Sequence, residues 1–248
     1  MIPIRTNAPN DGSPVVTMGL ILVNLAVFIY QTSLAGRAEL DFVLAYALVP
    51  KVYSHPLLAR QAGLDPSNFL PFITNTFMHG SWLHIAFNMW TLWLFGGPLE
   101  EALGKWRFLL VYLLFGLAGS LAHLLANWGS PVPVLGASGA IAGVLGTFTV
   151  LYPRARVGIL QPIFIFPLLL HVPALLYTAF WFGLQVWEGW ASLGQAGAGV
   201  AWWAHIGGFV AGLAAGYRLR HRRITQPAVW WRDLRTRQGR DTRSGPWG

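Results

Sequence analysis

The sequence predicts an all-α membrane protein, built as a bundle of six transmembrane helices. Of the 248 residues, 54% are hydrophobic and only 10% are charged, whereas soluble domains carry about 25% charged residues. The apolar residues also gather into separate runs, several of them close to the roughly 17–25 residues that cross the hydrocarbon of a bilayer. A chain this apolar cannot cover a soluble globule with charge, so we expect it to span the membrane several times.

Six apolar runs are expected to form the spans. They are residues 15–31, 82–99, 108–127, 137–152, 174–187 and 202–219. The first span has one alternative, a cleaved signal peptide, because small residues stand near Ser33 and Ala35. The long and weakly basic segment before it favours a retained helix. Residues 159–170 are apolar but contain Pro162 and Pro167, so they are open to three interpretations: a lead-in to the fifth helix, an interfacial segment or part of an extra span.

The positive charges orient the predicted bundle. The net charge is +8, and many of the arginines follow Gly216. A basic tail directly after a span is typical of a cytoplasmic flank drawn to anionic lipid, so we expect the lipid bilayer and no nucleic acid as a partner. With six spans, the cations of the short loops lie on the same side as this tail and the N-terminus. These cations are Lys105, Arg107, Arg154 and Arg156.

This orientation divides the chain into three parts. They are a cytoplasmic N-terminal segment (1–14), the six-helix domain (15–219) and a basic cytoplasmic tail (220–248). The basic tail, together with the lack of any organellar presequence, predicts a multi-pass protein of a bacterial plasma membrane.

Four polar residues from three predicted helices should share one depth. With both termini inside, the second, fourth and sixth helices begin at the outer side. His84 and Asn88 lie near the start of the second helix, Ser138 opens the fourth, and His205 lies near the start of the sixth. His84 and Asn88 are four residues apart and therefore share a helix face. Ionisable groups inside a span usually face the bundle interior and mark a function.

Ser138 has the surroundings of a nucleophile. It stands in a Gly-Ala-Ser-Gly sequence at 136–139 and opens a helix, whose free N–H groups can hold a developing oxyanion. The chain has no cysteine, which excludes a thiol nucleophile and cysteine metal sites. No Asp or Glu lies near the outer ends of the fourth and sixth helices. We therefore predict a Ser138–His205 dyad, in which packing orients the imidazole.

Stripes of small residues explain how the two helices could meet. Such stripes allow close helix approach in lipid, and approach here would bring hydroxyl and imidazole within reach, as nucleophilic catalysis requires. The stripes are Gly139, Gly143 and Gly146 on the fourth helix, and Ala204, Gly208, Gly212 and Gly216 on the sixth.

At these positions the sequence resembles the rhomboid proteases. The sequences His-Ile-Ala-Phe-Asn at 84–88, Gly-Ala-Ser-Gly at 136–139 and Ala-His-Ile-Gly at 204–207 look like the three signature motifs of that family, on its second, fourth and sixth helices. The resemblance covers about residues 15–217. It implies a six-helix rhomboid-like fold of bacterial type and an intramembrane serine protease that needs no metal or cofactor. The implied substrates are single-span membrane proteins, cut near the outer membrane boundary through an acyl-enzyme.

The resemblance also implies a role for each motif residue. Ser138 would be the nucleophile and His205 its base, while His84, Asn88 and the backbone N–H of Ser138 would form the oxyanion hole. Glu100, in a Gly-Pro-Leu-Glu sequence at 97–100, would be structural. The chain departs from the family pattern in two places. Residues 32–81 contain no Trp-Arg pair, and position 142 is an alanine where some members place an aromatic residue against the base.

Three other functions remain open from the sequence. A haem protein could use His84 and His205 as axial ligands, and a metal site could add Asn88, although no carboxylate or thiolate joins them. A non-catalytic rhomboid-like binder would typically lack the serine or the histidine, and this chain keeps both. His123 is expected to be structural or interfacial, and His79 to lie in a loop or at the rim of the site.

Overall fold

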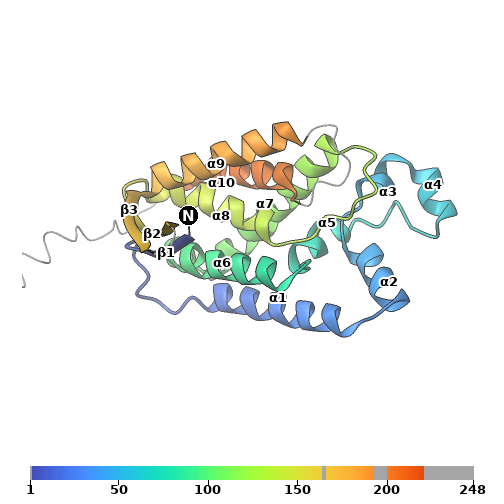
Figure 1. The fold of residues 1–248 in the computed structure, drawn as a ribbon, viewed down its shortest axis with the longest axis horizontal. Coiled ribbons are helices and arrows are strands. Elements are labelled where there is room, and N and C mark those ends of the chain that lie inside the picture. Colours follow the sequence, from blue (N-terminus) through green and yellow to red (C-terminus); the bar gives the residue numbers. More distant parts are fainter. Residues whose placement is uncertain (1, 164–165, 193–199, 221–248) are drawn as a thin grey trace, which may run out of the picture.

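The computed structural model describes residues 2–163, 166–192 and 200–220, which form a helical bundle with a small sheet at one end (Figure 1). Helices occupy all six predicted ranges, although some run further than expected. They are α1 (Val15–Ser33), α6 (Trp82–Leu103), α7 (Lys105–Ala126), α8 (Ser138–Leu151), α9 (Ala174–Ala191) and α10 (Trp202–Leu219). Most of the predicted tail, from residue 221 on, lies outside the described residues.

α8 is the central helix of the bundle. It contacts α6, α7, α9 and α10, and all of its residues are buried except Ser138 and Val150. A helix that is apolar on every side is one that is packed on every side. With 14 residues it is about 21 Å long, shorter than the roughly 30 Å of hydrocarbon in a bilayer.

The predicted contact between the small-residue stripes is confirmed. A side chain at Gly208 would collide with the carbonyl oxygen of Gly139, and one at Gly212 would collide with the carbonyl oxygen of Gly143. Backbone therefore packs directly on backbone along α8 and α10. This close approach holds the first turn of α8 beside the first turn of α10.

Glu100 fastens α1 to α6. The N-terminal turn of α1 follows Pro14 and has no side-chain cap of its own. The buried carboxylate of Glu100 instead accepts hydrogen bonds from the backbone N–H groups of Val16 (2.9 Å) and Thr17 (2.8 Å) and from the Thr17 hydroxyl (2.9 Å). A negative charge at a helix N-terminus satisfies free N–H groups and the positive end of the helix dipole. This is the structural role expected for Glu100.

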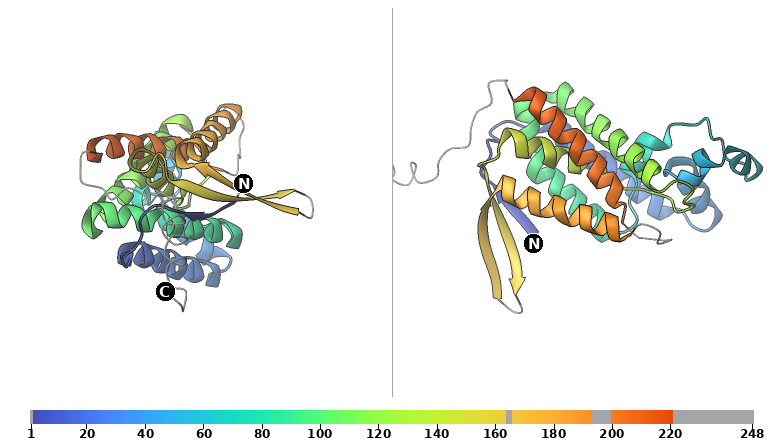
Figure 2. Two further views of the ribbon diagram at one scale, coloured as in Figure 1. Left: turned by 90° about the vertical axis from the view of Figure 1, so that its left-hand side faces the viewer. Right: turned by 90° about the horizontal axis from the view of Figure 1, so that it is seen from above.

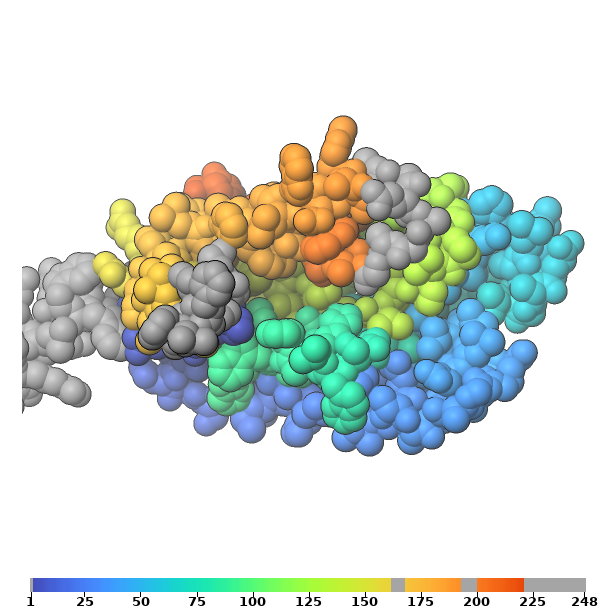
Figure 3. All heavy atoms as spheres, in the orientation of Figure 1, coloured from blue at the N-terminus to red at the C-terminus, as the bar shows by residue number. Residues whose placement is uncertain are grey.

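The long first loop folds into short helices at the end of the bundle opposite the sheet, as Figures 1 and 3 show. Three of them begin with a proline in the first turn, where the missing N–H removes no helical hydrogen bond. The elements are α2 (Arg37–Tyr46), α3 (Pro50–Ser54), α4 (Pro56–Gln61), α5 (Pro71–Thr74) and the 3-10 helix η1 (Asn75–Phe77). Figure 3 also shows α6 in green and α9 in orange on either side of a recess, with α8 behind them.

The prediction of an all-α fold is wrong for one region. Residues 159–170 are not a helical lead-in to the fifth helix or part of an extra helical span, while their place at the membrane interface stays a prediction. They belong to a β-hairpin, β2 (Arg156–Ile163) and β3 (Phe166–Pro173), which β1 (Ile2–Thr6) extends to an antiparallel sheet in the order β1-β2-β3. The hairpin projects from the bundle (Figure 2). Pro162 pairs with Pro167 beyond the part of β2 that β1 covers, where a missing N–H disturbs the sheet least.

By length and composition, two helices of the described residues are apolar enough to cross a membrane on their own, α1 and α7. α8 is apolar as well, but shorter. The count of six membrane spans therefore stays a prediction.

Candidate active site

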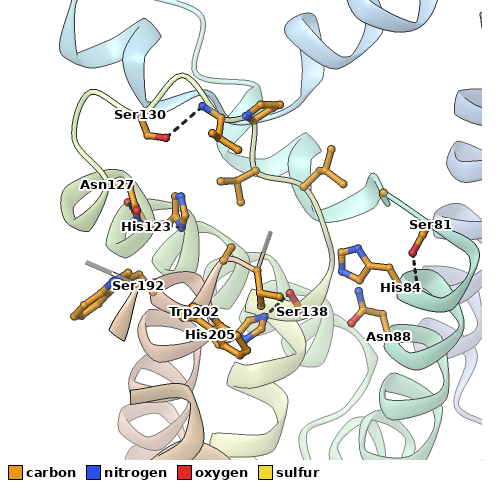
Figure 4. A pocket seen from close by; sticks show the side chains of 18 residues that line it. Ser81, His84, Asn88, His123, Asn127, Ser130, Ser138, Ser192, Trp202 and His205 are labelled. Atoms are coloured by element: carbon orange, nitrogen blue, oxygen red, sulfur yellow. Dashed lines mark hydrogen bonds between the residues drawn. The ribbon is translucent and has the colours of Figure 1, made fainter. Parts of the chain in front are cut away.

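A cavity of about 580 Å³ lies at the end of the bundle that carries the first-loop helices. Its walls come from the ends of α6, α7, α8 and α10 at this end of the bundle and from the loops between them. All four predicted site residues line it, so the structure brings together the residues that the sequence analysis expected to meet. The polar side chains that line it include His84, Asn88, His123, Asn127, Ser138 and His205 (Figure 4).

Ser138 and His205 form a direct hydrogen bond. The distance from Ser138 Oγ to His205 Nε2 is 2.7 Å. Ser138 is the first residue of α8 and is partly exposed to the cavity, while His205 lies in the first turn of α10 and is only 9% exposed. The glycine contacts between the two helices therefore bring together a hydroxyl and an imidazole that are 67 residues apart.

His84 and Asn88 stand on the other side of Ser138 from His205 (Figure 4). The His84 ring packs against Gly136, where an added Cβ would lie 2.8 Å from His84 Nε2. Gly136 also has a φ of +136°, which side chains rarely adopt. Glycine at this position thus lets the loop before α8 pass close to the ring. The side chains of His84 and Asn88 and the N-terminus of α8 therefore face the same cavity.

His79 lies in the loop before α6, as one of its two predicted places, but it is a buried partner of Asn88 and not a residue at the rim. It is 0% exposed, and the Asn88 side-chain amide donates to its Nε2 at 3.0 Å. Burial lowers the pKa of His79 to about 3, with a smaller contribution from His84. A neutral imidazole can accept the amide hydrogen bond, so His79 helps to fix the Asn88 side chain.

The imidazole of His205 has partners that the sequence did not reveal. Its Nδ1 lies 2.7 Å from Oε1 of Gln185, a buried residue of α9. The Trp181 ring lies 5.9 Å from the imidazole, measured between centroids, and the Trp202 ring stands at 90° to it at 6.0 Å. Aromatic rings therefore lie beside the imidazole although position 142 is an alanine. A single glutamine in an apolar helix has no motif or spacing that could have identified it.

His123 lies in the cavity wall. It is 8% exposed and lies next to Asn127, whose side-chain amide donates to the His123 carbonyl at 3.2 Å. No hydrogen bond among the described residues joins His123 to Ser138. Among the described residues, no group of three or more His, Cys, Asp or Glu has an arrangement that could hold a metal ion.

Comparison with known proteins assigns the family. Residues 66–222 match the family model of the rhomboid domain. The chain is 31% identical to Rhomboid protein 1, mitochondrial, of Saccharomyces cerevisiae, over 86% of this chain and 57% of the relative. It is also 31% identical to Rhomboid protease GluP of Bacillus subtilis (55% of this chain, 24% of the relative) and to Presenilin-associated rhomboid-like protein, mitochondrial, of Rattus norvegicus (64% and 39%).

The match contains the site and five of the six long helices, α6 to α10, but not α1. It includes every cavity residue named above, from His84 to His205. The chain spans little more than half the length of the yeast relative and a smaller share of the other two. The chain therefore belongs to the rhomboid family of integral membrane proteins.

Proposed function

We propose that the protein is an intramembrane serine endopeptidase in which Ser138 is the nucleophile and His205 the general base. The observation that carries this proposal is the 2.7 Å hydrogen bond between the two side chains inside a cavity lined with polar groups. A serine activated by a neighbouring base is the minimum unit of nucleophilic acyl transfer. The name of the Bacillus subtilis relative, a rhomboid protease, supports the same activity.

The proposed reaction uses this pair of side chains in two steps. Ser138 Oγ attacks the carbonyl carbon of the scissile peptide bond while its proton passes to His205 Nε2. The imidazolium returns that proton to the leaving amine, which leaves an acyl-enzyme. A water molecule, activated by His205 in the same way, then hydrolyses the ester.

The oxyanion of each tetrahedral intermediate would bind on the side of Ser138 that faces α6. The first N–H groups of a helix have no partner within the helix, and the N–H of Ser138 is at the start of α8. His84 and Asn88 line the same cavity and present side-chain N–H groups. Asn88 has two amide hydrogens, so it can donate to His79 and to an oxyanion at once.

The membrane arrangement is part of the proposal. α1, α6, α7, α8, α9 and α10 would be the six spans of a domain covering residues 15–219, and the substrates would be single-span membrane proteins cut near the outer boundary. The end with the sheet and the cationic loops would face the cytoplasm by the positive-inside rule. The relatives include mitochondrial proteins of yeast and rat beside a bacterial one, so they do not support the predicted bacterial plasma membrane over another membrane.

A haem or metal site is disfavoured by the bonding of His205. Both of its ring nitrogens are engaged, Nε2 by Ser138 and Nδ1 by Gln185. A metal ligand needs a free imidazole nitrogen, so either ligand set would have to break one of these bonds.

Labelling with a fluorophosphonate probe tests the proposal against a non-catalytic rhomboid-like binder. We expect the reconstituted protein to react covalently with the probe and to cleave a single-span substrate. Ser138→Ala should do neither while remaining folded in the membrane. Labelling that persists in Ser138→Ala, or a folded wild-type protein that never labels, would contradict the assignment.

A further inference from the structure

We propose that Gln185 is a positioning residue, which holds His205 in the one tautomer that can serve as a base for Ser138. The proposal rests on the proposed function. Gln185 lies on α9, outside the three motifs, and touches neither Ser138 nor the cavity. It would act on the reaction only through the imidazole.

The orientation of the Gln185 amide is fixed by its second partner. Its Nε2 donates to the backbone carbonyl of Trp181 at 3.1 Å. A carbonyl oxygen can only accept, so the nitrogen of the amide must be on that side and the oxygen must face His205. The assignment of Oε1 to the imidazole side therefore follows from the hydrogen-bond network rather than from an arbitrary choice between two similar atoms.

This orientation determines where the imidazole proton is. Because Oε1 of Gln185 accepts, Nδ1 of His205 must donate, and a neutral imidazole carries only one proton. Nε2 then presents its lone pair to Ser138 Oγ at 2.7 Å. In the other tautomer, the Nε2 hydrogen would point at the serine, so Nε2 could not accept its proton. The lone pair of Nδ1 would also face a lone pair of the Gln185 oxygen, which is repulsive.

A glutamine suits this place in a bilayer better than a carboxylate would. Gln185 is 5% exposed, and an ionised side chain at a buried position within a span is costly. The amide supplies the same acceptor without a charge. The Trp181 ring beside His205 belongs to the residue whose carbonyl orients the amide, four positions earlier on α9. One turn of α9 thus supplies both the hydrogen bond and the aromatic contact.

The experiment combines kinetics with a direct view of the proton. Gln185→Leu removes the acceptor at similar volume, and Gln185→Glu keeps an oxygen that can accept. We expect Gln185→Leu to lower kcat by about 10- to 100-fold with little change in KM, which is the effect of losing one buried hydrogen bond that the reaction uses. Gln185→Glu should recover most of the loss. In protein labelled with ¹⁵N-histidine and placed in nanodiscs, the His205 signal, identified by its loss in His205→Asn, should show the proton on Nδ1 in the wild type and not in Gln185→Leu.

Thr178→Val is the matched control. Thr178 is also buried on α9 and also makes hydrogen bonds, to Thr149 (2.8 Å) and to the Ala174 carbonyl (2.8 Å), but it does not touch His205. This variant should lose thermal stability without changing the His205 tautomer or kcat. A merely structural Gln185 would behave in the same way.

The outcomes separate this inference from the proposed function. Wild-type His205 with its proton on Nε2, or a folded Gln185→Leu with unchanged tautomer and kcat, would overturn the role of Gln185. If Gln185→Leu does not fold, the wild-type spectrum and the rate of Gln185→Glu still decide, because a positioning role requires Nδ1–H in the first and activity in the second. The spectrum can be recorded without a substrate. A wild-type protein that shows Nδ1–H but never labels at Ser138 would therefore contradict the proposed protease activity, while the orientation of the imidazole would still be supported.

Discussion

At the residue scale, neutral side chains surround the proposed dyad. His205 is bonded to Ser138 and Gln185, and the opposite wall of the cavity consists of His84 and Asn88. Neutral groups can be buried in a span with less desolvation than ions. The site therefore relies on hydrogen-bond geometry, and each residue in it can be tested by removing one contact.

Ser138→Ala and His205→Ala should each abolish cleavage of a reconstituted substrate. The two side chains form one hydrogen-bonded unit, and the effects of residues that act as a unit do not add. The double variant should therefore be no slower than either single variant. The measurement is the residual kcat of all three proteins above background, together with their melting temperatures. Multiplicative losses in the double variant would show that the residues act separately.

Asn88→Ala should lower kcat while still permitting slow labelling of Ser138. Loss of one oxyanion donor costs about 10²–10³ in rate, and the loss is smaller where His84 and the Ser138 N–H remain. The variant also leaves the buried His79 without the amide that bonds to its Nε2, so we expect a lower melting temperature as well. Full turnover at reduced stability would mean that Asn88 only supports His79 and lies outside the oxyanion hole.

The sequence predicted the site only where residues form a local pattern. His84 and Asn88 are four residues apart, and Ser138 and His205 each stand at a helix start beside small residues. Gln185 and the burial of His79 depend on contacts between distant segments, 20 residues apart in one case. Helical spacing does not encode such contacts: the first appears only when α9 is docked on α10, and the second when the loop before α6 packs beside α1 and α6.

At the scale of the element, the helices were predictable and the hairpin was not. Apolar length determines a helix in a bilayer, so α1, α6 and α10 begin where the sequence placed them. Residues 159–170 are equally apolar, but their form depends on pairing with one another and on β1, near the other end of the chain. Short apolar runs are compatible with strand or helix, and here long-range pairing decides.

Glu100→Ala should destabilise the docking of α1. It would leave two backbone N–H groups and the Thr17 hydroxyl without their acceptor, which costs on the order of 2–3 kcal/mol for a charged acceptor. Glu101→Ala is the matched control, since Glu101 is the adjacent residue, is exposed and accepts from the Gly12 N–H at 3.2 Å. Its loss should be below about 0.5 kcal/mol. Denaturant titration in mixed micelles measures both, and equal losses would mean that Glu100 does not hold α1.

Gly208→Ala should impair activity although Gly208 takes no part in the chemistry. The added methyl would collide with the Gly139 carbonyl, and neither backbone can rotate away. A displacement of about 1 Å at a reacting pair can reduce the rate about 10²-fold. Gly183→Ala is the control, because the space around Gly183 on α9 is open. Thr178→Val would be a poor control for this purpose, since Thr178 is a buried hydrogen-bonding residue. Parental activity in a folded Gly208→Ala would disprove the link between this contact and the dyad.

At the scale of the whole molecule, the cavity and the sheet lie at opposite ends of the bundle. The cavity lies at the end that carries the first-loop helices, and the sheet lies at the other end, with Arg5 on β1 and Arg156 on β2 (Figure 1). The described part of the chain thus has a polar recess at one end and cationic groups at the other. This polarity fits the orientation that the loop charges predicted.

The shortness of α8 makes the thickness of the bilayer a variable of the reaction. α8 runs from Ser138 to Leu151, and Tyr152 and Ala155 bury its inner end in the core. In the proposed orientation, the length of the central helix, about 21 Å, would set how far Ser138 lies above the cytoplasmic surface of the membrane. Lipids with longer acyl chains would then add hydrocarbon between Ser138 and the outer surface of the membrane. Water would have to travel further to reach the serine, and a substrate would be cut at a greater depth below that surface. We expect turnover to fall along a series of phosphatidylcholines of increasing chain length, while thermal stability changes little. A rate that is independent of chain length would mean that the bilayer thins around the protein to a constant local depth.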